Sequence, residues 1–514
     1  MKIKLITSAA IAALFAGGAM AQVVDSDIDQ NGNDNVAAVD QTGGNAGVAD
    51  IDQDGDRNTA LVTQTENPTI GSASFGNAAN LATVNQQGDD SFAQVTQNST
   101  DPSSSTPPPG NVTTSNQYSV GPATLAADTD DDANTPDELV TNIATSDQDG
   151  DLNTVTIDQG AFGASVSGES AFASQVGDGN SIAITQTGTG DVANASQVGN
   201  GNDADITQAG SDNFADSVQT GDDGTSSISQ DATSALAVVT QGGTGNSSLI
   251  VQSDDGQIVP NNGPTDADPE AYVEQAGADN SSVITQTAIG AGRALSADVL
   301  QNGNGNVSDI DQTATGGAAG FIEAAVTQTG DDNTSDIDQS ATETDTGFLS
   351  GGSAAGLLSA TVEQGGNGNS STISQTATSA NPSGGFAGDL TATVSQTGDD
   401  NTSGVSQTAT ADSFAGNARD LRAEVDQSGI GNSSDVTQDA SDAFLASGFN
   451  AVATVNQSGN DNSSDISQTL TPGALDGLND LVADVIQSGD GNDSSVTQTG
   501  EDATTLVEQS GNNN

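Results

Sequence analysis

The sequence has no cysteine, histidine or tryptophan, and its only lysines are Lys2 and Lys4. Without cysteine there are no disulfide bonds, so backbone pairing and side-chain packing must hold the chain together. Without histidine and cysteine, the histidine base, the cysteine nucleophile and the usual zinc site are excluded. We therefore predict that the chain is not an enzyme and has no cofactor. The aspartates lack the spacing of an EF-hand, which leaves weak, diffuse binding of divalent cations.

Positive charge is also scarce. The chain has six lysines and arginines against 71 aspartates and glutamates, and its formal net charge at pH 7 is −65. Such a surface repels nucleic acid and anionic lipid at long range, so we predict no nucleic-acid partner. Close packing of copies would need salt, divalent cations or low pH to screen the repulsion.

Long hydrophobic runs are absent, and the one apolar stretch near the N-terminus is short. Leu5 to Phe15 follow the two lysines and precede the small-x-small sequence Ala19-Met20-Ala21. This is the pattern of a secretory signal peptide, and the stretch is too short to span a bilayer as a helix. We predict cleavage between Ala21 and Gln22, export through the periplasm, and no membrane insertion.

Composition alone favours disorder, because only 32% of the residues are hydrophobic and 3% are aromatic. The apolar residues are not scattered, however. They follow a frame, Q-x-G-x-x-N-x5-Q, in which Gln, Gly, Asn and Gln stand at positions 0, +2, +5 and +11. The full frame recurs between Gln30 and Gln487.

Each unit of the frame predicts a strand, a turn and a second strand. In the units from Gln275 to Gln487, position −4 is Ala, −2 is Val, +7 is Ser and +9 is Val or Ile. The fixed positions on either side of the glycine have period two, which is the spacing of one face of a strand. Glycine at +2 marks a sharp bend, where only glycine is unhindered at positive φ.

One such arc cannot bury its inner face alone, but stacked copies can. We therefore predict an all-β, cross-β fold, a β-solenoid of stacked strand-turn-strand arcs with about 16 rungs spaced about 4.8 Å apart. Identical side chains would form ladders along the stack. The predicted ladder residues are Gln275, Gly277, Asn280, Gln286, Gln301, Gly303, Asn306, Gln312, Gln328, Gly330, Asn333, Gln339, Gln364, Gly366, Asn369, Gln375, Gln396, Gly398, Asn401, Gln407, Gln427, Gly429, Asn432, Gln438, Gln457, Gly459, Asn462, Gln468, Gln487, Gly489, Asn492 and Gln498.

The frame also predicts the organisation of the chain. Residues 1–21 are the signal peptide, 22–97 carry N-terminal repeats, and 148–514 form the main repeat solenoid. Residues 98–147 lack the frame, are rich in Pro, Ser and Asp, and include Pro107-Pro108-Pro109. We expect this stretch to be an insertion that loops out of the stack or is disordered.

The frame, for example Gln427, Gly429, Asn432 and Gln438, resembles the curlin repeat of curli, the amyloid fibres of bacterial biofilm matrices. The resemblance covers residues 28–97 and 148–514, with Ser at +7 where the family usually has Ala. It implies a secreted structural subunit that polymerises with itself at the cell surface as a fimbrium for adhesion. It also implies a nucleator subunit, an outer-membrane secretion pore and chaperones as partners. Only Gln22 to Ile28 precede the first unit, where the family has a pore-addressing segment, which leaves the export route open.

Two other interpretations of the sequence stay open. The chain could be an acidic β-solenoid adhesin, or a divalent-cation-binding protein, that does not polymerise. It could also be a permanently disordered polyanion. Seeded growth with thioflavin binding separates the fibre from the adhesin, and a circular dichroism spectrum without β signal identifies the polyanion.

Overall fold

The computed structural model contains forty strands and no helix in the residues that it describes. The predicted all-β solenoid is confirmed, with about 15 rungs. The structure describes residues 3–5, 11–17, 25–32, 34–42, 48–54, 59–66, 81–87, 92–99, 112–118, 124–131, 143–149, 153–160, 169–254, 269–289, 293–316, 320–343, 354–379, 386–411, 417–418, 420–441, 449–470, 479–500 and 502–514.

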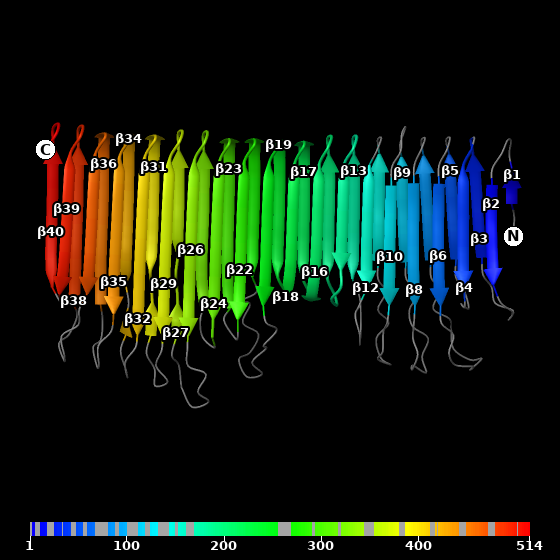
Figure 1. Cartoon of the computed structure of the whole chain (residues 1–514), viewed down its shortest axis with the longest axis horizontal. Coiled ribbons are helices and arrows are strands. Elements are labelled where there is room, and N and C mark those ends of the chain that lie inside the picture. The colour runs from blue at the N-terminus through cyan, green and yellow to red at the C-terminus, as the bar shows by residue number, and fades with distance from the viewer. Residues whose placement is uncertain are drawn as a thin grey trace, which may run out of the picture. The chain divides into compact units, whose positions relative to one another are not determined.

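The chain divides into two compact units, Met1–Gly245 and Asn246–Asn514. Within each unit, parallel strands stack into two sheets (Figure 1). We call sheet A the one whose strands carry the first Gln of the frame, and sheet B the one whose strands carry the second. Successive strands along the chain alternate between the sheets, apart from short extra strands in sheet A of the second unit.

In the first unit, sheet A contains β1 (Ile3–Leu5), β3 (Asp25–Asn31), β5 (Val48–Asp54), β7 (Leu81–Gln87), β9 (Val112–Tyr118), β11 (Ile143–Asp149), β13 (Ser170–Val176), β15 (Val192–Val198), β17 (Phe214–Asp222) and β19 (Leu236–Thr244). Sheet B contains β2 (Ile11–Gly17), β4 (Val36–Thr42), β6 (Thr59–Glu66), β8 (Phe92–Ser99), β10 (Thr124–Asp131), β12 (Thr154–Gly160), β14 (Ser181–Gln186), β16 (Asp203–Ser211) and β18 (Thr225–Thr233).

In the second unit, sheet A contains β21 (Glu270–Ala278), β23 (Arg293–Asn304), β25 (Gly320–Thr329), β27 (Ala354–Gly356), β28 (Ala360–Gly365), β30 (Phe386–Gly388), β31 (Thr391–Asp399), β33 (Asn417–Ala418), β34 (Leu421–Ile430), β36 (Phe449–Asn460), β38 (Asn479–Ser488) and β40 (Ala503–Ser510). Sheet B contains β20 (Ser247–Asp254), β22 (Ser281–Ile289), β24 (Val307–Thr315), β26 (Thr334–Glu343), β29 (Ser370–Ser379), β32 (Thr402–Ala411), β35 (Ser433–Ser441), β37 (Ser463–Leu470) and β39 (Asp493–Gly500).

Pairing is in register with the frame. Between β21 and β23, for example, Gln275 pairs with Gln301 and Val273 with Val299. Inward and outward residues alternate in burial, so Val, Ile and Ala of the frame are almost completely buried. A one-residue slip would expose every one of these side chains, which is why a strict period of two specifies the pairing.

A second apolar layer lies in the second unit, beyond the fixed positions of the frame. Position −6 is mostly Leu or Ile and position +13 is mostly Ala, and these residues form one buried cluster. In one rung the large and the small side chain exchange places, so that position −6 is Ala451 and position +13 is Leu470. The exchange keeps the packed volume roughly constant, as a close-packed interior requires.

The insertion expected at residues 98–147 does not loop out as a whole. Its strands β9 and β10 lie within the sheets, and Gln117 pairs with both Gln86 and Gln148. In β10, Thr129 pairs with Gln97 and Gln159. The stretch adds strands because the backbone ladder needs extended chain more than it needs the second Gln, whose place Thr129 takes. The prolines lie outside β9 and β10.

The predicted signal segment contributes β1 and β2, which pair with β3 and β4 in the uncleaved chain. Ala21 and Gln22 lie outside the described residues, so the cleavage site stays a prediction.

The turn glycines at +2 stack closely on one another. Gly429 has a φ of 116°, and a Cβ placed on it would lie 1.9 Å from the carbonyl oxygen of Gly459 in the next rung. Both the backbone angle and the neighbouring backbone therefore require glycine.

We expect Gly429→Ala to lower the free energy of unfolding by more than about 1–3 kcal/mol, which is the cost of the strained φ alone. The matched control is Gly404→Ala in β32, where a Cβ would meet only the Asp435 carboxylate at 3.4 Å. Urea unfolding followed by circular dichroism measures both. Equal unfolding midpoints for the two variants would contradict the stacking.

Candidate functional site: the amide columns and the turn edge

The predicted ladder glutamines of the second unit form two continuous columns. In each column, Nε2 of one Gln donates to Oε1 of the Gln in the next rung, at 2.7–2.9 Å. The sheet A column contains Gln275, Gln301, Gln328, Gln364, Gln396, Gln427, Gln457, Gln487 and Gln509. The sheet B column contains Gln252, Gln286, Gln312, Gln339, Gln375, Gln407, Gln438, Gln468 and Gln498.

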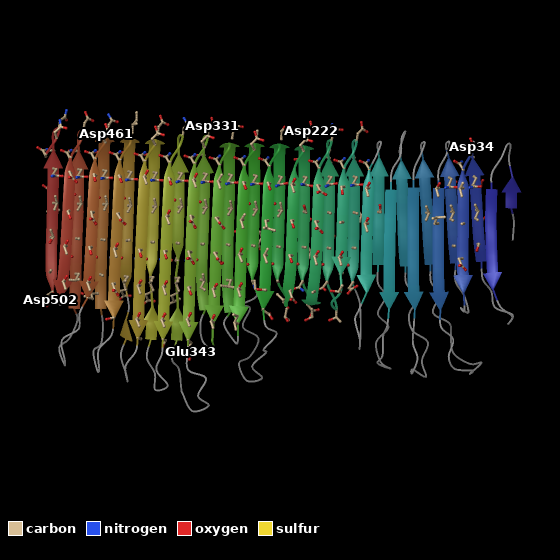
Figure 2. All side chains as sticks on the ribbon, viewed as in Figure 1. Asp34, Asp222, Asp331, Glu343, Asp461 and Asp502 are labelled. Carbon is tan, nitrogen blue, oxygen red and sulfur yellow. The ribbon has the colours of Figure 1, made fainter. Side chains whose placement is uncertain are left out.

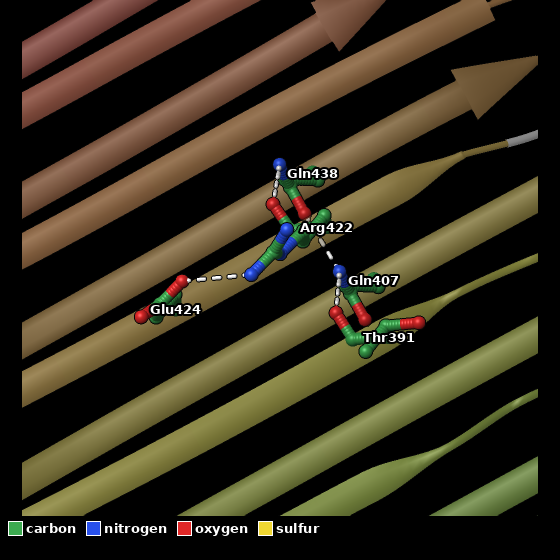
Figure 3. Close-up of polar contacts among 5 residues, drawn as sticks. All are labelled: Thr391, Gln407, Arg422, Glu424 and Gln438. Carbon is green, nitrogen blue, oxygen red and sulfur yellow. Dashed lines mark hydrogen bonds and ion pairs between the residues drawn. The ribbon is translucent and has the colours of Figure 1, made fainter.

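Each amide also bonds across to the opposite sheet. Gln407 Nε2 donates to the Thr391 carbonyl at 3.1 Å, and Gln438 Nε2 donates to the Arg422 carbonyl at 3.0 Å (Figure 3). Both amide hydrogens are therefore used in a dry interior, where an unpaired donor would cost about 1–3 kcal/mol. These bonds connect the two sheets and give each column a direction, with donors pointing toward the following rung.

The predicted asparagines at +5 form a third column, which acts on the glycine turns. The Asn306 backbone N–H donates to Asn280 Oδ1 at 3.0 Å, and Asn306 Nδ2 donates to the Gly330 carbonyl at 2.8 Å. The same arrangement joins the other predicted Asn and Gly residues of this edge. The glycine carbonyl that leaves no room for a Cβ on the preceding glycine is thus the same carbonyl that accepts the asparagine amide. The residues are Gly277, Gly303, Gly330, Gly366, Gly398, Gly429, Gly459 and Gly489, with Asn280, Asn306, Asn333, Asn369, Asn401, Asn432, Asn462 and Asn492.

The predicted frame does not include position +4, although the residues at this position follow a regular pattern that is visible in the sequence. Position +4 has a φ of 55–69° in each turn of the second unit, and Asp alternates there with Gly rung by rung. The Asp332 carboxylate occupies the space above Gly305 where a Cβ would lie. Alternation keeps two carboxylates from stacking on each other. The series is Asp279, Gly305, Asp332, Gly368, Asp400, Gly431, Asp461, Gly491 and Asn513.

Acidic side chains mark both edges of the second unit. Asp331 and Asp461 lie at the edge with the glycine turns, and Glu343 and Asp502 lie at the opposite edge (Figure 2). On the outer face, Asp309 is in register with Asp336. Partial burial, and then the charges of Asp336 and Asp311, raise the pKa of Asp309. Partial burial and the Asp465 charge likewise raise the pKa of Asp435.

The buried serines at +7 are a second feature beyond the predicted ladder. In the first unit Ser226 faces Ser217 at position −2, and their hydroxyls bond at 2.9 Å. In the second unit position −2 is Val, and the serine hydroxyls have no partner in the structure. Each such hydroxyl adds a desolvation cost without a compensating bond. These serines are Ser248, Ser282, Ser308, Ser335, Ser371, Ser403, Ser434, Ser464 and Ser494.

Asp191 in the first unit stands where other turns have Asn. It is fully buried; its Oδ1 accepts from Asn213, while Oδ2 is buried without a partner. In the equivalent place, Asn180 Nδ2 donates to the Gly199 carbonyl. Burial, with a smaller contribution from Asp212, raises the pKa of Asp191, against the bonds from Asn213 that lower it. A protonated Asp191 can donate as asparagine does.

These features define a repeat protein of the parallel β-solenoid class, held by columns of amides. The curlin associated repeat matches residues 177–210, 199–231 and 479–511. The chain therefore contains curlin associated repeats in both units. No curated protein sequence matches it.

The described part of the chain contains no group of three or more His, Cys, Asp or Glu residues placed to hold a metal ion. It also contains no helix long and apolar enough to cross a membrane. Weak, diffuse binding of divalent cations stays a prediction.

We expect Gln407→Glu to lower the free energy of unfolding at pH 7 by more than about 3 kcal/mol, because a buried carboxylate would face two acceptors, Gln438 Oε1 and the Thr391 carbonyl. The matched control is Ser406→Glu, which adds the same charge on the exposed face beside Ser374 and Thr437. Urea unfolding measures both, and equal losses would contradict the role of the column.

We expect Asp191→Asn to raise stability at pH 7 by about 1–3 kcal/mol and to leave it unchanged near pH 3. A raised pKa means that the folded chain binds the proton more tightly, so this part of the stability is present at acid pH and is lost as pH rises from 3.8 through the folded pKa. Glu169 in the preceding rung and Asp212 in the following one face the group. The exposed control is Asp231→Asn, and a pH series of thermal melts is the measurement. A parallel pH dependence of wild type and Asp191→Asn would contradict the assignment.

Proposed function

We propose that this chain is the structural subunit of an extracellular, curli-like amyloid fibre that serves in biofilm matrix and adhesion, and that it is not an enzyme. The observation that carries the proposal is the open edge at β40. This strand pairs with β38, and its inward side chains are only half-buried. The equivalent Val485 in the rung below is completely buried.

An open edge with matching columns favours a second copy of the same chain as the partner. Unpaired backbone groups of an edge strand are a template for another strand. The columns add side-chain specificity, because an incoming rung with Val and Gln at the same spacing continues both the apolar and the amide ladders. The two ends of a polar column differ, so copies would join head to tail and form an open filament rather than a closed dimer.

The remaining partners follow from the curlin-repeat family. A nucleator subunit, chaperones and an outer-membrane secretion pore would bring the chain through the periplasm to the cell surface. Assembly outside the cell also fits the charge, since external salt, divalent cations or acidity would screen the repulsion between copies.

The test is seeded elongation of residues 22–514 followed by thioflavin fluorescence, with fibre diffraction of the product. We expect seeds to remove the lag and a reflection at about 4.8 Å along the fibre. Val507→Asp, which places a charge on the inward face of β40, should abolish addition to that end. Leu506→Asp on the outward face of the same strand is the matched control; Leu506 is 58% exposed.

A monomer that persists at high salt in the presence of seeds would overturn the proposal in favour of the non-polymerising adhesin. Equal elongation by Val507→Asp and Leu506→Asp would show that β40 is not the growing edge.

A further inference from the structure

The sheet B glutamine column of the second unit changes its bonding at Gln498. Earlier glutamines of this column donate Nε2 to the next glutamine, as Gln468 does to Gln498 Oε1 at 2.8 Å. Gln498 Nε2 instead donates to the hydroxyl oxygen of Thr505 in β40, at 3.0 Å. Its bond across to the Val482 carbonyl, at 2.8 Å, is the same as in the other rungs. The threonine hydroxyl thus takes the place that a glutamine oxygen holds elsewhere.

Thr505 is also an exception in the sequence. It stands at position −4 of the Gln509 rung, a position that is otherwise alanine in the second unit. Those alanines are fully buried and have no polar atom to offer the column. The exception falls in the rung whose inward face is half-open, next to the last described glutamine of the sheet B column. The alanines are Ala271, Ala297, Ala324, Ala360, Ala392, Ala423, Ala453 and Ala483.

We propose that Thr505 is a removable cap on the sheet B column, and that it is exchanged for a glutamine when a second copy docks. The inference rests on the proposed stacking of copies. In the free chain the hydroxyl gives the Gln498 amide an acceptor at 3.0 Å in a nearly dry site, since Gln498 is only 4% exposed, whereas the Ala503 carbonyl lies at the longer distance of 3.4 Å. In the fibre the oxygen of an incoming glutamine replaces it.

The polarity of the columns identifies the group that displaces the cap. In the sheet B column of the first unit, Gln186 Nε2 donates to Gln208 Oε1 at 2.9 Å, in the same direction as in the second unit. The oxygens of this column therefore face the opposite side, where β2 of the predicted signal segment pairs with β4 of sheet B. Once the signal is removed, this end of a copy offers glutamine oxygens. This end of one copy is therefore complementary to the end of another copy at which the Gln498 amide donates.

The cap acts on the rate of growth. The bond from Gln498 to Thr505 must break before the bond to the incoming glutamine forms, so the threonine slows each addition. The final column has the same number of bonds with either partner. A hydroxyl at this position therefore keeps the free chain satisfied and delays its polymerisation.

The experiment measures seeded elongation rates of full-length mature chains carrying Thr505→Val, Thr505→Ser or Thr504→Ala. Thr505→Val keeps the shape and removes the hydroxyl, and we expect it to elongate about two- to tenfold faster than wild type, as the loss of one hydrogen bond predicts. Thr505→Ser keeps the hydroxyl and should elongate like wild type. Thr504→Ala, on the exposed face of the same strand, is the matched control and should also be unchanged.

The outcomes separate the cap from the fibre. If wild type elongates and Thr505→Val elongates at the same rate, the cap is overturned and the fibre stands. If none of the chains elongates under any salt or pH, the proposed function fails and the cap fails with it. If Thr505→Ser, which keeps the hydroxyl, accelerates elongation as much as Thr505→Val, the hydroxyl does not control the rate, which also overturns the cap. Circular dichroism of each variant confirms that the starting chains are folded alike.

Discussion

At the stacked glycine turns of the second unit, from Gly277 to Gly489, the carbonyl oxygen of one glycine lies where a Cβ of the preceding glycine would be, only 1.9 Å away for Gly429 and Gly459. The same oxygen accepts the side-chain amide of an asparagine, as Gly459 does from Asn432 at 2.9 Å. Glycine at +2 and asparagine at +5 are therefore two sides of one contact between rungs. Because this contact fixes the height and the register of each turn, the strands that leave the turn are placed so that Val stacks on Val and Gln on Gln.

The glutamine columns depend on that register and add direction to it. Each amide uses one hydrogen along the column and one across to the other sheet, so the glutamine donors inside the stack are paired and their bonding changes at the ends of the columns. A net hydrogen bond contributes only about 0.5–1.5 kcal/mol, whereas an unmet donor costs more. The columns therefore act chiefly against wrong registers and wrong partners. At the open end, Gln498 and Thr505 show how the chain keeps one such donor satisfied.

The strand-turn-strand arcs and the ladder positions could be predicted because a strict period of two on each side of a glycine has no helical counterpart. The strands within residues 98–147 could not, because β10 has Thr129 in place of the second Gln and so does not fit the frame. The alternation of Asp and Gly at +4 was visible in the sequence, but its meaning needs the distance between Asp332 and Gly305. The cap at Thr505 was hidden for a different reason. A threonine among alanines is unremarkable until a neighbouring glutamine is seen to lack its usual partner.

The contacts that limit repulsion between acidic side chains are different from the contacts that set the register of the strands. At the glycine turns, Asp332 lies against Gly305 rather than against another carboxylate, so the stack carries acids there without direct repulsion. On the outer face, Asp309 and Asp336 lie side by side without a glycine between them. Partial burial, and then the neighbouring carboxylates, raise the pKa of Asp309. Contacts between copies would multiply such pairs, since each junction adds another layer of acidic faces at about 4.8 Å. The amide and glycine contacts can thus decide which strands pair, while protons and salt decide when copies come close enough to pair at all.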